Sequence, residues 1–77
     1  MPKHSVHVTR ASGGSRWRVS QGASTVSMHR TQSNAISRGR RDAMKDGVDL
    51  VTHGMDGRIR SISSFRNGSL QSLDLER

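Results

Sequence analysis

Three short runs in the first thirty residues of this 77-residue chain alternate apolar and polar side chains with a period of two. Successive side chains of an extended strand point to opposite faces, so each run predicts a half-buried β-strand. Glycine-bearing segments of hairpin size, residues 12–15 and 21–24, separate the runs. The apolar face of the predicted sheet comprises Val6, Val8, Trp17, Val19, Val26 and Met28. The opposite face is polar and basic and comprises His7, Thr9, Arg16, Arg18, Ser20, Thr25, Ser27 and His29.

A helix is predicted to follow the third run. Thr31 is a suitable N-cap residue, and Gly47 suits the left-handed position that ends many helices. Between them lies a narrow stripe at helical spacing, which comprises Ala35, Ile36, Gly39, Ala43 and Met44. Glycine inside a helix costs about 1 kcal/mol relative to alanine. We therefore expect close packing of the helix on the sheet at Gly39 to compensate.

The second half of the chain predicts a closing β-hairpin. Residues 48–53 are apolar on both sides, which suits a central strand, and an Asp-Gly turn separates them from a returning edge strand over residues 58–63. The predicted fold class is α+β, with a three-stranded antiparallel sheet, one helix packed on one face, and then the hairpin. Residues 1–63 would form a single small domain, followed by a flexible C-terminal tail over residues 64–77.

The order of these motifs is similar to that of a known family. The segments SVHVT, RWRVSQGAS, VSMHRTQSNAISRGR and DGVDLVTHGMDGRIRS, taken in order, resemble the DUF2188 family of small bacterial and phage proteins of unassigned function. The resemblance covers residues 6–65, and its most specific part is the HGMDGRI segment at residues 53–59. It implies a fold and no activity.

A second likeness is architectural. Three short strands with a basic face and a Thr-initiated helix, over residues 15–46, look like the arm-binding N-terminal domain of tyrosine-recombinase integrases. Such domains place a three-stranded sheet in the major groove of DNA. This likeness rests on the pattern of elements alone.

The charge of the chain points to an anionic partner. Thirteen Lys and Arg against six Asp and Glu give a net charge of +7, and the first thirty residues hold five bases and no acid. Arginine is well shaped for phosphates and base edges. We expect a small basic module that binds nucleic acid, as duplex DNA, through the open sheet face. The predicted nucleic-acid-binding residues are Arg10, Arg16, Arg18, Arg30, Arg38 and Arg41.

Two alternatives remain open. One is an interaction protein encoded by a phage or mobile element, which would inhibit a host protein that is acidic or itself binds nucleic acid. A free sheet edge could extend the sheet of such a partner, or could form a homodimer. The other is surface charge that only keeps the domain in solution. With two aromatic residues in the chain, Trp17 and Phe65, a base-stacking surface is not expected, so duplex is favoured over single strands.

Several classes of protein are not expected. The sequence shows no paired carboxylates, no nucleophile–base pattern and no phosphate-binding loop, so we expect neither an enzyme nor a cofactor. Cysteine is absent, and His4 and His7 would point to opposite faces of a strand, so no metal site is expected. No apolar segment approaches membrane-spanning length. We therefore expect a cytoplasmic protein that does not bind membranes.

Overall fold

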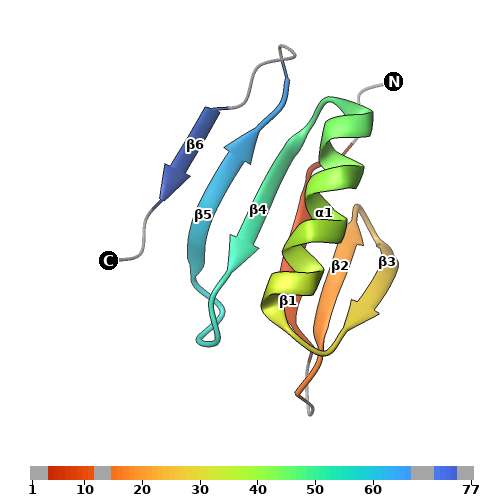
Figure 1. Ribbon diagram of the computed structural model, residues 1–77, viewed down its shortest axis with the longest axis vertical. Helices are drawn as coiled ribbons and strands as arrows, with labels where there is room; N and C mark the ends of the chain where they lie inside the picture. The colour runs from red at the N-terminus through yellow and green to blue at the C-terminus, as the bar shows by residue number, and fades with distance from the viewer. Residues whose placement is uncertain (1–3, 12–14, 67–70, 75–77) are drawn as a thin grey trace.

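The computed structural model of the chain describes residues 4–11, 15–66 and 71–74. Within these ranges, six strands form one sheet in the order β3-β2-β1-β4-β5-β6, and a single helix lies on one face (Figure 1). The fold is therefore α+β, as predicted. The elements are β1 (Val6–Arg10), β2 (Trp17–Gln21), β3 (Ser24–His29), α1 (Gln32–Asp46), β4 (Asp49–His53), β5 (Ile59–Ser64) and β6 (Gln71–Asp74).

The prediction of a separate three-stranded antiparallel sheet with a closing hairpin is wrong. β4 pairs in parallel with β1, with Val6 opposite Leu50, so the β4–β5 hairpin belongs to the same mixed sheet. Leu50 and Val51 are buried on opposite faces of β4, which explains its central position. β5 is not an edge strand either, because β6 pairs with it. Alternation within a strand reveals its faces but neither its neighbour nor the direction of pairing.

The core lies between α1 and the strands beneath it. Figure 1 shows α1 crossing the sheet over β1 and β2, with β4 beside them. A Cβ added at Gly39 would lie 2.9 Å from Cδ1 of Leu50 and 3.2 Å from Cγ2 of Val8, so the predicted close approach is confirmed. The buried cluster comprises Val6, Val8, Trp17, Val19, Ala35, Ala43, Val48, Leu50 and Phe65.

Both predicted helix ends are confirmed. Thr31 Oγ1 accepts a hydrogen bond from the backbone N–H of Asn34 at 3.1 Å, and Gly47 adopts a left-handed φ of 66°. Met44, however, was expected in the apolar stripe, and its residue is 58% exposed. Each residue turns the helix by about 100°, which carries Met44 away from the sheet although its neighbour Ala43 is buried.

The third strand departs from the prediction. The pairing of β2 with β3 shifts between Val19 and Ser20, which leaves Val26 as the extra residue of a β-bulge. Met28 lies opposite Arg18 on the face without the helix, and Val26 and Met28 are 36% and 39% exposed. The assignment of Met28 to the apolar face is therefore wrong. Val26 lies on the helix side near Asp46 and Gln21, as predicted, but it is exposed at the edge and is not in the core. As an edge strand, β3 can expose both sides, and its alternation could not show which side packs.

Part of the segment expected to be a tail is a strand. Ser64 ends β5, Phe65 is buried against the core, and β6 pairs with β5. Residues 67–70 and 75–77 lie outside the described residues, so the prediction for them is not tested. Among the described residues, no helix has the length and apolar character needed to cross a membrane.

Candidate nucleic-acid interface

The end of β1, the start of β2 and the end of β3 meet in one row at one end of the sheet. Arg10 lies opposite Trp17, and Trp17 lies opposite His29. Arg16 precedes this row in the chain and Arg30 follows it, and both are exposed. We call Arg10, Arg16 and Arg30 the basic end. Since α1 begins two residues after Arg30, its N-terminus lies at the same end.

Trp17 positions the first of these cations. The guanidinium carbon of Arg10 lies 5.9 Å from the centroid of the Trp17 ring, within the range of a cation–π contact. Trp17 itself is 6% exposed and part of the core, as the sequence predicted. The indole therefore positions the Arg10 side chain at the rim of the covered face.

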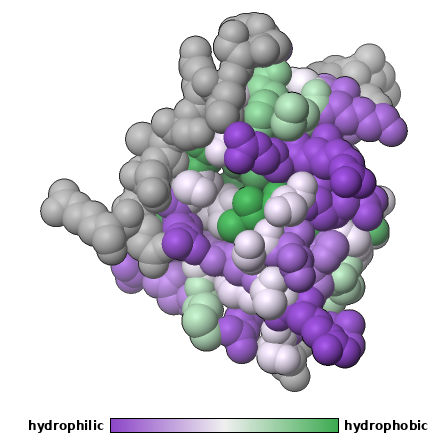
Figure 2. All heavy atoms as spheres, viewed as in Figure 1, coloured by the Kyte–Doolittle hydropathy of each residue, from purple (hydrophilic) through white to green (hydrophobic). Residues whose placement is uncertain are grey.

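The N-terminus of α1 adds partial positive charge at this end. Its first turn contains no acidic residue. Unpaired backbone N–H groups at a helix N-terminus favour anions. Figure 2, which views the helix side of the molecule, shows many hydrophilic side chains on this face, interspersed with apolar and near-neutral ones. The basic end therefore continues a hydrophilic surface.

Four acidic side chains have partners close to them in the fold. Their contacts are Asp42 with Arg38 at 3.2 Å, Asp46 with Gln21 at 3.0 Å, Asp49 with Arg66 at 3.0 Å, and Asp56 with Arg58 at 3.8 Å. None of these contacts involves the basic end. Arg10, Arg16 and Arg30 therefore lie outside these four carboxylate contacts.

Arg18 occupies a different position, on the open face of the sheet. It lies between Thr9 and Met28 on the neighbouring strands. Its Nε atom is buried and has no hydrogen-bond partner among the described residues. A buried donor without an acceptor costs free energy. An anion that reached this guanidinium could accept from it and remove that cost.

The structure does not bring the six predicted arginines together on the open face. Arg10 shares the face of Trp17, and Arg38 and Arg41 are on α1, where Arg38 is paired with Asp42. Arg16 and Arg30 are at the end of the sheet, and Arg18 alone is on a strand of the open face. The sequence predicted that this region is basic. It did not show which side chains of each strand face the helix and which face the open side of the sheet.

A histidine pair on the open face was not predicted. Nδ1 of His7 lies 3.0 Å from Nε2 of His53, and the two rings stack with centroids 5.3 Å apart. Residues 46 apart in the chain give no spacing signal, and only the parallel pairing of β1 with β4 brings them together. Burial, and then the charge of His53, lower the pKa of His7.

The hydrogen bonds of the pair fix its proton positions when both rings are neutral. His53 Nδ1 lies 3.1 Å from the carbonyl oxygen of Gly57, which can only accept, so this nitrogen carries the proton. His53 Nε2 is then an acceptor, and His7 Nδ1 donates to it. His53 thus also ties the end of β4 to the turn that follows it. No group of three or more His, Asp or Glu side chains in the described residues could hold a metal ion.

Comparison with known proteins identifies a family without a known activity. A family model described as "Uncharacterized protein conserved in bacteria (DUF2188)" matches residues 6–65. No curated protein and no solved structure matches the chain. The matched residues run from the first residue of β1 to Phe65.

Proposed function

The chain belongs to the DUF2188 family of uncharacterised bacterial proteins, and for it we propose a non-enzymatic role in binding nucleic acid, with duplex DNA in the cytoplasm as the ligand. The observation that carries the proposal is the basic end, where Arg10, Arg16 and Arg30 lie at the same end of the fold as the N-terminus of α1 and none of the ion pairs found among the described residues involves them. Phosphates are the anions that arginine and helix N-termini bind most readily.

The dimensions of the sheet favour binding through this end. Neighbouring strands lie about 4.8 Å apart, so six strands are roughly 24 Å wide. A major groove about 12 Å wide cannot accept that whole face. The ends of β1, β2 and β3 span only about 10 Å. We therefore replace the flat sheet-in-groove arrangement with one in which this end enters the groove or follows its phosphates.

Within this arrangement the six arginines have different roles. Arg16 and Arg30 contact phosphates directly because they are exposed, and Arg10 contacts a phosphate or base edge from its position on Trp17. Arg18 contacts a phosphate of the strand that passes the open face. Arg38 and Arg41 lie further along α1 and contribute only long-range attraction.

Salt dependence with charge-matched variants tests the proposal. Fluorescence anisotropy would measure the affinity for a duplex of about 20 base pairs at about 50 and about 200 mM salt. Arg16→Gln/Arg30→Gln removes two charges from the basic end. Arg40→Gln/Lys45→Gln removes two charges from exposed positions on α1 and is the matched control.

The two double variants should behave differently. Each phosphate contact contributes about 0.9 to the slope of log affinity against log salt, so the loss of Arg16 and Arg30 should flatten the slope by about 1.8. The control should change the slope by less than about half that amount. Equal effects of the two variants would show that binding follows net charge alone. Absence of binding at the lower salt concentration would refute the proposed function.

A further inference from the structure

β3 is an edge strand, and no described strand pairs with its outer side. Natural sheets protect such edges with charged residues, proline, bulges or short length. The six residues of β3 include neither a charged residue nor a proline, and two of them, Val26 and Met28, are more than one third exposed. The bulge at Val26 is the one protective feature among these residues. The outer edge can therefore accept a further strand.

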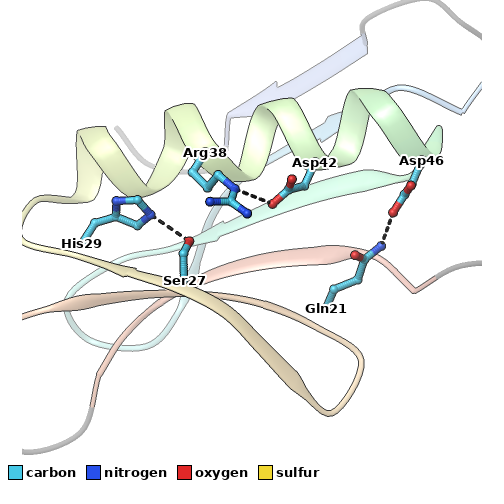
Figure 3. Close-up of polar contacts among 6 residues, drawn as sticks. All are labelled: Gln21, Ser27, His29, Arg38, Asp42 and Asp46. Atoms are coloured by element: carbon cyan, nitrogen blue, oxygen red, sulfur yellow. Dashed lines mark hydrogen bonds and ion pairs between the residues drawn. The ribbon is translucent and has the colours of Figure 1, made fainter.

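The surface above β3 is polar. Figure 3 shows Arg38 and Asp42 on the side of α1 that faces β3, near Ser27 and His29. Ser27 Oγ and His29 Nε2 form a hydrogen bond of 2.8 Å, and Arg38 binds Asp42. A strand added to β3 would place every second side chain next to these polar groups of β3 and α1. Charged or polar side chains could form hydrogen bonds or ion pairs there, whereas apolar side chains could not.

The same side of α1 is basic. At about 100° per residue, Arg38, Arg41 and Lys45 lie along one side of the helix. Arg41 and Lys45 are exposed, and the Asp42 carboxylate is already bound by Arg38. An incoming strand would therefore run beside the cations Arg41 and Lys45 and the Arg38–Asp42 pair, with the Asp46 carboxylate, which accepts from Gln21, near Val26.

From the free edge and this row of cations we propose that the outer edge of β3 binds an extended acidic segment of a partner protein, which adds a strand to the sheet. Backbone hydrogen bonds to β3 supply affinity, and carboxylates that alternate along the segment meet the cations of α1. A second copy of the chain fits less well, because each copy carries a charge of +7. This interaction goes beyond the proposed nucleic-acid function and does not use the basic end.

Synthetic peptides can test whether binding requires both an extended strand and a negative charge on the partner. The probe is a peptide of roughly ten residues in which Glu alternates with Thr or Val. One control peptide has the same net charge but contains two prolines, which prevent strand pairing. A second control has Lys in place of Glu. Amide chemical shifts and hydrogen exchange of the protein would locate binding. The probe should protect the β3 amides and bind at least about tenfold more tightly than either control.

Variants of the edge provide the second readout. Val26→Glu/Met28→Glu places two carboxylates on β3, and Met44→Glu/Met55→Glu places two at exposed sites elsewhere, with the same change in net charge. The first should weaken probe binding by about tenfold or more, and the second by less than about twofold. Circular dichroism would confirm that both remain folded.

Three results would overturn the inference. One is equal binding of the proline-containing peptide, another is an equal loss in both Glu variants, and the third is protection located away from β3. Each would indicate attraction to a basic surface without strand addition. Arg16→Gln/Arg30→Gln should leave probe binding unchanged within about twofold. The failure of this inference is therefore distinguishable from failure of the nucleic-acid proposal.

Discussion

The two faces of the sheet are stabilised in different ways. On the face covered by α1, Val6, Val8 and Val19 have no exposed surface. On the open face, Nε of Arg18 has no hydrogen-bond partner among the described residues, and His7 is held by its hydrogen bond to another histidine. The apolar core cluster of the described residues lies under α1, whereas on the open face the buried Val51 is accompanied by polar side chains. Substitutions on the covered face should change folding stability, and those on the open face should change binding or pH response.

The largest effect is expected at Gly39, where the helix approaches the sheet most closely. In Gly39→Val, the new side chain would collide with Leu50 and Val8, because even a Cβ lies 2.9 and 3.2 Å from them. We expect the free energy of unfolding to fall by about 2 to 3 kcal/mol, measured by urea denaturation. Ser37→Val, at an exposed position of the same helix, is the control for the lower helix propensity of valine. Similar losses in both variants would contradict this packing role.

A pair of truncations compares the faces directly. Val19→Ala opens a cavity beneath α1 and should cost about 2 kcal/mol. Met28→Ala, on the neighbouring strand but on the open face, should cost less than about 0.5 kcal/mol because Met28 is already 39% exposed. Thermal or urea denaturation measures both. If Met28→Ala is as destabilising as Val19→Ala, the open face is stabilised by a contact outside the described residues.

The histidine pair should make the open face sensitive to pH. Burial, and then His53, lower the pKa of His7 from its ordinary value of 6.5. The unfolded chain then binds a proton at pH values where the folded chain does not. Stability therefore increases with pH between the lowered pKa and 6.5, and it is lost as pH falls through this interval.

The variant His7→Asn should have a smaller pH dependence than the unmodified chain. Urea midpoints at about pH 5.5 and about pH 7.5 would measure the difference. His4→Asn, at an exposed position before β1, is the control and should retain the original dependence. An unchanged pH dependence in His7→Asn would show that another group is responsible.

The smallest change in stability is expected at Arg18. Arg18→Met keeps a long side chain between Thr9 and Met28 and removes the buried Nε donor, for which residues 4–11, 15–66 and 71–74 offer no acceptor. The free energy of unfolding should change by less than about 0.5 kcal/mol. Affinity for duplex DNA should nevertheless fall, since one cation is lost. A marked loss of stability would show that Arg18 has a structural partner.

The sequence predicted the elements better than their assembly. Thr31 and Gly47 marked the ends of α1, and Gly39 marked its contact with the sheet, because capping and close approach each require particular residue types. The parallel pairing of Val6 with Leu50 depends on a contact across 44 residues, for which no local residue pattern exists. The bulge at Val26 is also a property of the pairing with β2, and it reverses the alternation after that residue, so Met28 was assigned to the wrong face.

The sequence predicted that the candidate interface is basic, but it did not predict how its side chains are arranged in space. The absence of acids before Thr31 located the excess charge, and the structure keeps that excess near β1, β2 and β3. The contact of Arg10 with Trp17 follows from the register of β1 with β2. The pairing of His7 with His53 follows from the register of β1 with β4. Such contacts between distant segments require a register, which period-two alternation leaves open.

The position of β1 between β2 and β4 has a consequence for the order of folding. Val6 lies opposite Gln21 on one side and Leu50 on the other, so its two partners are synthesised far apart in time. Closing the shorter loop costs less entropy, so the β1–β2–β3 meander can form before α1 and β4 dock. During synthesis, the β4 side of β1 remains an unpaired edge until residue 52 has left the ribosome. Folding of the whole sheet therefore depends on the arrival of β4.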